Sequence, residues 1–263
     1  MFKIVTWNVN SIGVRLSRLL AFLDREKPDV LCLQELKCDD AKFPAGEIEA
    51  AGYHAAVFGQ KTYNGVALLS RLPPENIQRN FGGKDDDPAS RFISARYSPP
   101  GSEPLTVMCA YCPNGQSLGS EKFAYKMDWF ARLRRHFDAN YQKSDRIVIT
   151  GDFNIAPEDR DVWDPVAWKE HIHCSSGERA ALAEVVGFGL YDTFRLHHKD
   201  AGLFSWWDYR ELSFQQNKGL RIDLIYATRP LAGVCVRTQI DRNERKGEKP
   251  SDHAPVIAEF KLS

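Results

Sequence analysis

The stretch Arg146-Ile147-Val148-Ile149-Thr150-Gly151-Asp152-Phe153-Asn154 decides which fold we expect for the whole chain. Its apolar, β-branched run predicts a buried strand, and the glycine predicts the point where the chain leaves the sheet. Ligands of open α/β sheets bind where strands end, so Asp152 and Asn154 lie where a site is expected. Residues two apart in an extended segment share a face and can address one ligand. An acid and an amide after a strand also form ordinary turns, so this pair alone does not establish a site.

The composition excludes some classes of protein. The chain has 263 residues with 35 basic and 35 acidic side chains, and a net charge of zero excludes a uniformly basic, histone-like surface. Cys32, Cys109 and Cys235 lie in apolar runs, which predicts reduced core residues and no disulfide framework. No segment has the length of a membrane span, and no secretory signal precedes the first predicted strand. We expect a single cytoplasmic domain over residues 1–263, monomeric and without a membrane partner.

Apolar periodicity divides the chain into strands interleaved with a few helices. Helices are expected at residues 15–26, 122–137 and about 178–186, where apolar side chains recur at helical spacing. Besides the central strand, strands are expected at residues 2–9, 29–33, 53–58, 65–70, 91–97, 105–111, 203–207, 222–227, 234–240 and 255–260. Both halves of the chain place polar pairs at strand ends, which indicates two related sheets. The pattern predicts an α/β fold of layered sheets.

Polar side chains suited to catalysis gather at the ends of these predicted strands. They are Asn8, Glu35, Tyr111, Asp152, Asn154, Asp223, Asp252 and His253. Taken singly, Tyr111 and His253 are more often structural, but Asp223 lies inside an apolar strand, where a carboxylate is costly unless paired or bound to a cation. The set is rich in oxygen and lacks a Cys/His cluster, which favours Mg²⁺ or Mn²⁺ over zinc. A carboxylate near His253 would fix its tautomer. These groups are what metal-assisted hydrolysis of a phosphate ester requires.

Six short motifs carry a resemblance to a known family. They are Thr6-Trp7-Asn8-Val9-Asn10, Leu33-Gln34-Glu35-Leu36-Lys37, Asn64-Gly65-Val66-Ala67-Leu68-Leu69-Ser70, Gly151-Asp152-Phe153-Asn154-Ile155, Leu220-Arg221-Ile222-Asp223 and Ser251-Asp252-His253-Ala254-Pro255. Through them the whole chain resembles the exonuclease III family of apurinic/apyrimidinic (AP) endonucleases, within the endonuclease/exonuclease/phosphatase superfamily. The segment Ser205-Trp206-Trp207-Asp208-Tyr209-Arg210 and the Leu-Arg-Ile-Asp motif narrow the resemblance to the DNA-repair branch. It implies a DNase I-like, four-layer αββα sandwich of two packed mixed sheets flanked by helices.

The resemblance also implies a metal site. Glu35 resembles the principal ligand of Mg²⁺, for which Mn²⁺ is the expected substitute. Asn8 lies beside it in the family pattern, and Asp252 supports the ligands from behind.

Catalytic roles follow from the same resemblance. Asp152 resembles the residue that holds the attacking water or protonates the leaving 3′ oxygen, and the sequence leaves these two roles open. His253, paired with Asp223, resembles either the base or an imidazole that binds the phosphate. Asn154 and Tyr111 resemble contacts to the phosphate and the leaving group.

Substrate selection is expected at an apolar pocket. Trp206, Leu220 and Ile222 resemble the pocket that receives an extruded baseless sugar. Relatives that cut well at abasic sites tend to carry a small residue near the position of His173, so an imidazole there is expected to occupy space that the sugar needs. The structural alternative is a loop histidine satisfied by hydrogen bonds. We therefore expect processing of 3′ ends to exceed incision at abasic sites.

A basic loop leads into the last motif. We expect backbone phosphate contacts, independent of base sequence and sensitive to salt, from Arg242, Arg245, Lys246 and Lys249. The sequence thus predicts a Mg²⁺-dependent nuclease of base excision repair, acting on duplex DNA with damaged or blocked 3′ ends or abasic sites. Its expected activities are those of a 3′–5′ exonuclease and a 3′-phosphatase or 3′-phosphodiesterase, and AP endonuclease activity is left open. Two alternatives stay open: a phosphatase of a small or lipid phosphoester, and a catalytically silent nucleic-acid-binding module.

Overall fold

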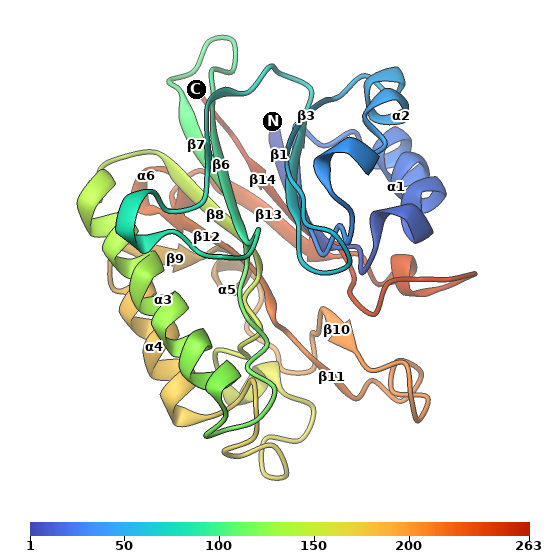
Figure 1. Ribbon diagram of the computed structural model, residues 1–263, viewed down its shortest axis with the longest axis vertical. Helices are drawn as coiled ribbons and strands as arrows, with labels where there is room; N and C mark the ends of the chain where they lie inside the picture. Colours follow the sequence, from blue (N-terminus) through green and yellow to red (C-terminus); the bar gives the residue numbers. More distant parts are fainter.

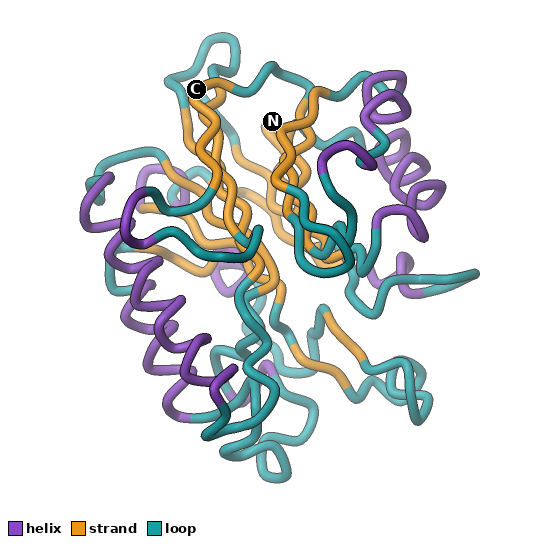
Figure 2. The backbone as a smooth tube through the Cα atoms, in the orientation of Figure 1, coloured by secondary structure: helices purple, strands orange, loops and turns teal.

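Two six-stranded sheets pack face to face in the computed structural model, which describes residues 1–263 (Figures 1 and 2). The first sheet has the order β13 (Cys235–Ile240), β14 (Val256–Phe260), β1 (Phe2–Asn8), β2 (Val30–Gln34), β4 (Val66–Ser70) and β3 (His54–Phe58). The second has the order β5 (Glu75–Arg79), β6 (Phe92–Tyr97), β7 (Leu105–Tyr111), β8 (Ile147–Asp152), β12 (Asp223–Thr228) and β9 (Leu190–Asp192). The pairs β1–β2 and β7–β8 are parallel and their other neighbours antiparallel, so both sheets are mixed.

Helices cover the outer faces of both sheets. On the first sheet lie α1 (Ile12–Glu26) and α2 (Ala45–Ala50), and on the second α3 (Glu121–Asn140) and α4 (Ser176–Val186), as Figure 1 shows. The short helices are α5 (Thr193–His197) and α6 (Arg229–Ala232), and short 3-10 turns lie at Asp40–Lys42, Gly83–Asp85, Asp159–Asp161 and Arg242–Arg245. The predicted four-layer αββα sandwich is confirmed. No helix combines the length and the apolarity needed to cross a bilayer.

Apolar side chains fill each space between the layers. The largest cluster, of 22 buried residues, lies between the two sheets, and clusters of 19 and 16 lie beneath the helices of the second and first sheet. Burying a large apolar side chain contributes about 1.5–3 kcal/mol, so these clusters hold the layers together. Since the inter-sheet cluster fixes one sheet against the other, polar residues at the strand ends of both sheets keep constant positions.

Gly151 has a different role from the one predicted. The strand does not end there, because β8 continues to Asp152. A Cβ atom at Gly151, where φ is 151°, would lie 1.8 Å from the carbonyl oxygen of Ala110 on the neighbouring strand β7. Any side chain would force the two central strands apart. The glycine therefore permits the close approach of β7 that sets Asp152 beside Tyr111 in the register of the sheet.

The predicted strand at residues 203–207 is mostly absent. Only β10 (Trp206–Trp207) is extended, and it pairs with β11 (Gly219–Leu220) in a two-stranded ribbon outside the main sheets. An isolated bridge joins Trp206 to His253, which attaches this ribbon to the end of the sandwich that carries the polar residues.

Candidate active site

Strand ends from both sheets bring the predicted polar residues together. Asn8 ends β1, Glu35 follows β2, Asp152 ends β8, and Asp223, at the start of β12, is its direct partner across the ladder. His253 lies just before β14. One ligand atom each from Glu35, Asp152 and His253 lies within 4.8 Å of the others. Residues distant in sequence therefore form one cluster between the two sheets.

His253 is oriented by Asp223. Its Nδ1 lies 2.9 and 3.0 Å from the two carboxylate oxygens of Asp223, and its Nε2 lies 3.7 Å from Oδ2 of Asp152. Burial would lower the pKa of His253, but the charges of Asp223, Asp152 and Asp252 outweigh it and raise the pKa to about 10. These charges favour the protonated ring, with Nδ1 facing Asp223 and Nε2 facing Asp152.

Asp152 is held by two donors. Its Oδ2 accepts from Nδ2 of Asn8 at 2.9 Å, and its Oδ1 accepts from the backbone N–H of Asn154 at 2.9 Å. Burial raises the pKa of Asp152 to about 7, although the charge of His253 opposes the shift. A carboxyl group with a pKa near neutrality can both accept and return a proton under ordinary conditions.

Asn8 does not face the cluster as a metal ligand would. Its Nδ2 donates to Oε1 of Glu35 and to Oδ2 of Asp152, each at 2.9 Å, and its Oδ1 accepts from the backbone N–H of Asn10 at 3.0 Å. Turning the amide over would place its oxygen against two carboxylates. Asn8 therefore joins the two carboxylates here, and its place among the metal ligands stays a prediction.

The remaining donors fit a hard cation. Glu35 is half-buried, and its Oε2 already lies 2.9 Å from the ammonium group of Lys37. Carboxylate oxygens of Glu35 and Asp152 predominate in the cluster, and its one imidazole is directed at two carboxylates. Oxygen donors of this kind suit Mg²⁺ or Mn²⁺ better than zinc. The cluster is a candidate metal site, with Glu35 as its most accessible ligand.

Asp252 supports the cluster indirectly. Its Oδ1 accepts from Nδ2 of Asn10 at 2.9 Å and its Oδ2 from Nε1 of Trp206 at 3.0 Å, while Oδ1 of Asn10 accepts from Nζ of Lys37 at 2.5 Å. Burial would raise the pKa of Asp252, but the charge of His253 and these two hydrogen bonds lower it overall. Sequence reasoning missed the roles of Asn10 and Lys37, although both lie two residues after Asn8 and Glu35 in the quoted motifs.

Tyr111 and Asn154 border the cluster on the side of the second sheet. Nδ2 of Asn154 donates to the carbonyl oxygen of Cys112 at 2.9 Å, and the residue has a left-handed backbone with φ of 52°. Burial, followed by the charges of Glu35 and Asp152, raises the pKa of Tyr111, so its hydroxyl stays a donor. The guanidinium of Arg91 lies 4.8 Å from the centre of the Tyr111 ring. Tyr111, Arg91 and Asn114 line one groove of about 740 Å³.

The expected sugar pocket is partly covered. Trp206 is half-buried, whereas Leu220 and Ile222 are buried beneath it, so only Trp206 presents a surface to a ligand. His173 is also buried, and its ring centre lies 6.4 Å from that of Trp206. Nδ1 of His173 lies 2.6 Å from the carbonyl oxygen of Asn154. The imidazole therefore occupies the space between Trp206 and the Asn154 segment.

The basic loop divides into two kinds of residue. Arg242, Lys246 and Lys249 are exposed to solvent, where a phosphate backbone can reach them. Arg245 is buried, donating through Nη1 to the carbonyl oxygen of Ser251 and through Nη2 to that of Trp207. Arg245 therefore stabilises the loop from inside the protein. The expectation that it contacts DNA is corrected.

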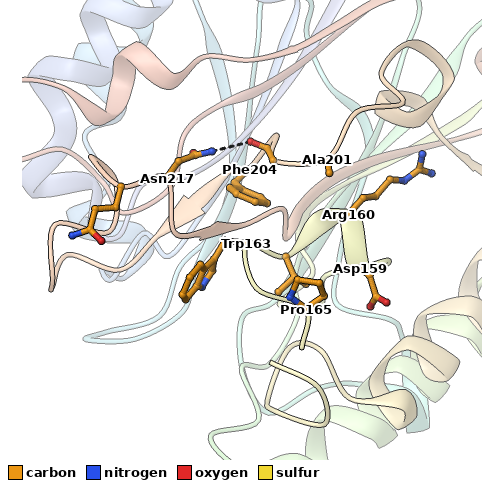
Figure 3. A pocket seen from close by; sticks show the side chains of 10 residues that line it. Asp159, Arg160, Trp163, Pro165, Ala201, Phe204 and Asn217 are labelled. Carbon is orange, nitrogen blue, oxygen red and sulfur yellow. Dashed lines mark hydrogen bonds between the residues drawn. The ribbon is translucent and has the colours of Figure 1, made fainter. Parts of the chain in front are cut away.

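A second pocket lies apart from this cluster. It measures about 630 Å³ and includes Asp159, Arg160, Trp163 and Phe204 among its lining residues (Figure 3). None of the polar residues at the strand ends lines it. Its aromatic and apolar walls lie along the edge of the β10–β11 ribbon, where the backbone N–H of Trp163 donates to the carbonyl oxygen of Gly219. This pocket contains no catalytic constellation.

The fold and the acidic cluster define a metal-assisted hydrolase of phosphate esters. Residues 5–253 match the Endonuclease/Exonuclease/phosphatase family. Exodeoxyribonuclease III of Haemophilus influenzae is 39% identical over 267 residues, which cover 98% of this chain and 100% of that protein. The chain belongs to the endonuclease/exonuclease/phosphatase family and is a hydrolytic nuclease.

Two solved structures are similar along the full length of both chains. One is the 3′ phosphatase NExo from Neisseria bound to product DNA hairpin, with 42% identity and a TM-score of 0.94. The other is an AP endonuclease from Archaeoglobus fulgidus, with 35% identity and a TM-score of 0.94. Each covers 100% of this chain.

Proposed function

We propose that this chain is a Mg²⁺-dependent DNA repair nuclease that processes the 3′ ends of duplex DNA in preference to internal abasic sites. Removal of 3′ phosphates and of terminal nucleotides are its expected main activities. The observation that carries this preference is the buried His173 beside Trp206. The similarity to a Neisseria 3′ phosphatase and to Haemophilus influenzae exodeoxyribonuclease III supports it.

The contacts of the central residues support the following roles. The imidazolium of His253, held by Asp223, donates from Nε2 to a phosphoryl oxygen. Asp152, with its pKa near neutrality, takes the proton of the attacking water and returns one to the leaving oxygen. Tyr111 donates its hydroxyl hydrogen to the phosphate, and Asn154 orients Asp152 through its backbone N–H. A divalent cation bound at Glu35 would polarise the phosphoryl group and offset charge on the leaving oxygen.

The preference for 3′ ends has a steric reason. An internal abasic sugar must turn out of the duplex before its phosphate meets the cluster, and it needs a pocket to enter. His173 lies in the space that Trp206 would otherwise offer. A terminal 3′ phosphate needs no extrusion, so the imidazole is no obstacle to it.

One panel of duplexes tests this function. The substrates are a nick with a 3′ phosphate, a recessed 3′ hydroxyl and an internal abasic analogue, each with Mg²⁺, Mn²⁺ or excess chelator, with inositol phosphate as the comparison for a small-molecule phosphatase. We expect kcat/KM to be highest for the 3′ phosphate. Faster turnover of inositol phosphate would contradict the proposal, and so would abasic cleavage as fast as 3′-phosphate removal.

A single variant separates the steric reason from the general activity. His173→Gly should raise abasic incision about tenfold or more, the scale on which a pocket accepts or rejects a small group, and leave 3′-phosphate removal nearly unchanged. The variant removes the ring without touching Glu35, Asp152 or His253. An unchanged rate at the abasic analogue would show that His173 does not limit entry.

A further inference from the structure

A buried ion pair lies behind the candidate active site. Lys126 on α3 and Glu178 on α4 are both 0% exposed, and Nζ of Lys126 lies 2.5 Å from Oε1 of Glu178. Replacing a buried ion pair by apolar residues is often neutral or even stabilising, so such a pair is weak evidence for a stabilising role. What the two charged groups hold in place is therefore the informative observation.

Lys126 joins three separate segments. Its ammonium donates to Glu178 and also to the carbonyl oxygens of Asn154, at 2.7 Å, and of Asn114, at 3.1 Å. These contacts use all three hydrogens of the group. Asn154 follows strand β8, and Asn114 follows strand β7. One ammonium group thus fixes the two loops that border the cluster against helix α4.

Glu178 holds the backbone of His173. Its Oε1 accepts from the N–H of His173 at 3.0 Å, and its Oε2 accepts from the N–H and the hydroxyl of Ser175 at 3.1 and 2.7 Å. His173 has a φ of 73°, a left-handed conformation that non-glycine residues seldom adopt. The carboxylate of Glu178 stabilises that conformation directly.

The His173 ring is held by the same network. Its Nδ1 must carry a hydrogen, because it faces the carbonyl oxygen of Asn154, to which Lys126 also donates. Its Nε2 then accepts from Nδ2 of Asn114 at 3.4 Å. Burial and the neighbouring charge of Lys126 lower the pKa of His173 to about 4, in agreement with a neutral ring. The backbone and the ring of His173 are therefore both held by groups that the Lys126–Glu178 ion pair positions.

We propose that Lys126 and Glu178 are positioning residues that set substrate choice, by keeping His173 in the pocket beside Trp206. Neither residue touches substrate. This inference rests on the proposed function, because His173 can exclude an internal sugar only if the pocket beside Trp206 is a sugar-binding pocket. The network also fixes the Asn154 segment, so its loss should slow 3′-end processing to a smaller extent.

The test changes both charges together, because removing one alone leaves the other buried and unpaired. In Lys126→Met/Glu178→Gln, kcat/KM for the abasic analogue relative to the 3′ phosphate should rise roughly tenfold, on the scale of steric discrimination. In a His173→Gly background the same double change should move this ratio by less than about twofold, because coupled residues are non-additive. Arg132→Met is the control: it removes a buried cation from the same helix that lies 2.9 Å from Asp128 and 3.8 Å from Asp87 and contacts neither Glu178 nor the carbonyl oxygens of Asn114 and Asn154.

Two further measurements do not depend on activity. Loss of Lys126 should raise the pKa of the His173 ring in an NMR titration, and loss of the Glu178 contact should speed hydrogen exchange of the His173 amide. Glu178→Asp keeps the charge but shortens the side chain. This variant should also raise kcat/KM for the abasic analogue relative to the 3′ phosphate. It therefore still tests the proposal if the double variant does not fold.

The outcomes separate this inference from the proposed function. If wild-type protein cleaves none of the duplexes, the proposed function fails, while the NMR and exchange data still report whether the pair positions His173. If wild-type protein is active and a folded double variant keeps both the wild-type ratio and slow exchange at His173, the positioning role is wrong. An equal rise of the ratio in the His173→Gly background would overturn it as well.

Discussion

Glu35 differs from the other carboxylates of the site in its exposure. Asp152 and Asp223 are buried and engaged by protein donors, whereas the side chain of Glu35 is 18% exposed and pairs with Lys37, whose side chain is 30% exposed. A cation arriving from solvent displaces an ammonium group more easily than a backbone donor. This accessibility is why Glu35 is the residue on which metal binding should depend most.

Removing Glu35 should therefore abolish activity without unfolding the protein. For Glu35→Ala we expect kcat/KM on the 3′-phosphate duplex to fall at least about a hundredfold, because the metal stabilises the transition state by several kcal/mol. High Mn²⁺ should restore part of the rate. Glu26→Ala is the matched control, since Glu26 is 20% exposed and pairs with Lys3 far from the cluster. Full wild-type activity in excess chelator would contradict a role for any metal.

Asp223 and His253 should act as one unit. The carboxylate fixes the ring through Nδ1 at 2.9 Å, so losing either member disorders the same donor to the phosphate. We expect Asp223→Asn, His253→Asn and the double variant each to lower kcat by a similar factor, roughly 10²–10⁴, as for a general acid or base. Steady-state kinetics at saturating Mg²⁺ would measure the cycle. Multiplicative losses in the double variant would mean that the two residues act independently.

At the scale of elements, buried strands were predictable because their side chains are apolar on both faces. The central strands β1, β2, β7 and β8 are buried along nearly their whole length, and each overlaps a segment predicted from apolar, β-branched runs. Strand β5 was missed because it lies at a sheet edge and reads Glu-Asn-Ile-Gln-Arg, a mostly exposed polar segment. Periodicity reports burial, so an exposed edge strand leaves no signal.

Short elements were missed for a related reason. Helices α2 and α5 and strand β9 are shorter than the windows in which periodicity is read, about 11–18 residues for a helix and about 4–8 for an alternating strand. The predicted strand at 203–207 contains aromatic residues, but only Trp206 and Trp207 find a partner, across the ladder in Gly219 and Leu220. The aromatic composition predicted β structure there. Only the two residues that pair with a neighbouring strand form one.

From the sequence, only the site residues that lie in recognisable motifs could be predicted. Each motif named a residue at a strand end, and the αββα topology brought Glu35, Asp152 and His253 together. The orientation of Asn8 depends on hydrogen bonds to Glu35 and Asp152 in two other segments, and only its contact with Asn10 lies within its own motif. Lys126 lies on the buried face of α3 with Trp129 and Phe130. A lysine at such a position is a usable signal, but its partner Glu178 lies 52 residues away.

At the scale of the whole molecule, the net charge is zero, so binding to DNA requires a local concentration of basic residues on the surface. With 35 basic and 35 acidic residues, attraction to a polyanion must come from where the charges lie. The exposed cations Arg242, Lys246 and Lys249 form a basic loop that leads into Asp252 and His253. Arg245 holds this loop from inside, so its position relative to the cluster is constrained.

Neutralising the basic loop should weaken DNA binding and reduce its salt dependence. Each phosphate contact adds about 0.9 to the slope of log K against log salt, so replacing all three exposed loop cations by Gln should reduce the slope by roughly 2 to 3. Fluorescence anisotropy with a nicked duplex in chelator, from low to moderate salt, measures the slope without cleavage.

The matched control replaces Lys27, Arg71 and Lys261, which are exposed at the opposite end of the first sheet according to its strand register. Because both triple variants change net charge equally, a long-range effect of charge alone would lower the two slopes by the same amount. Only a direct contact between loop and backbone makes the loop variant lose more, and equal slopes would exclude the loop from the DNA interface.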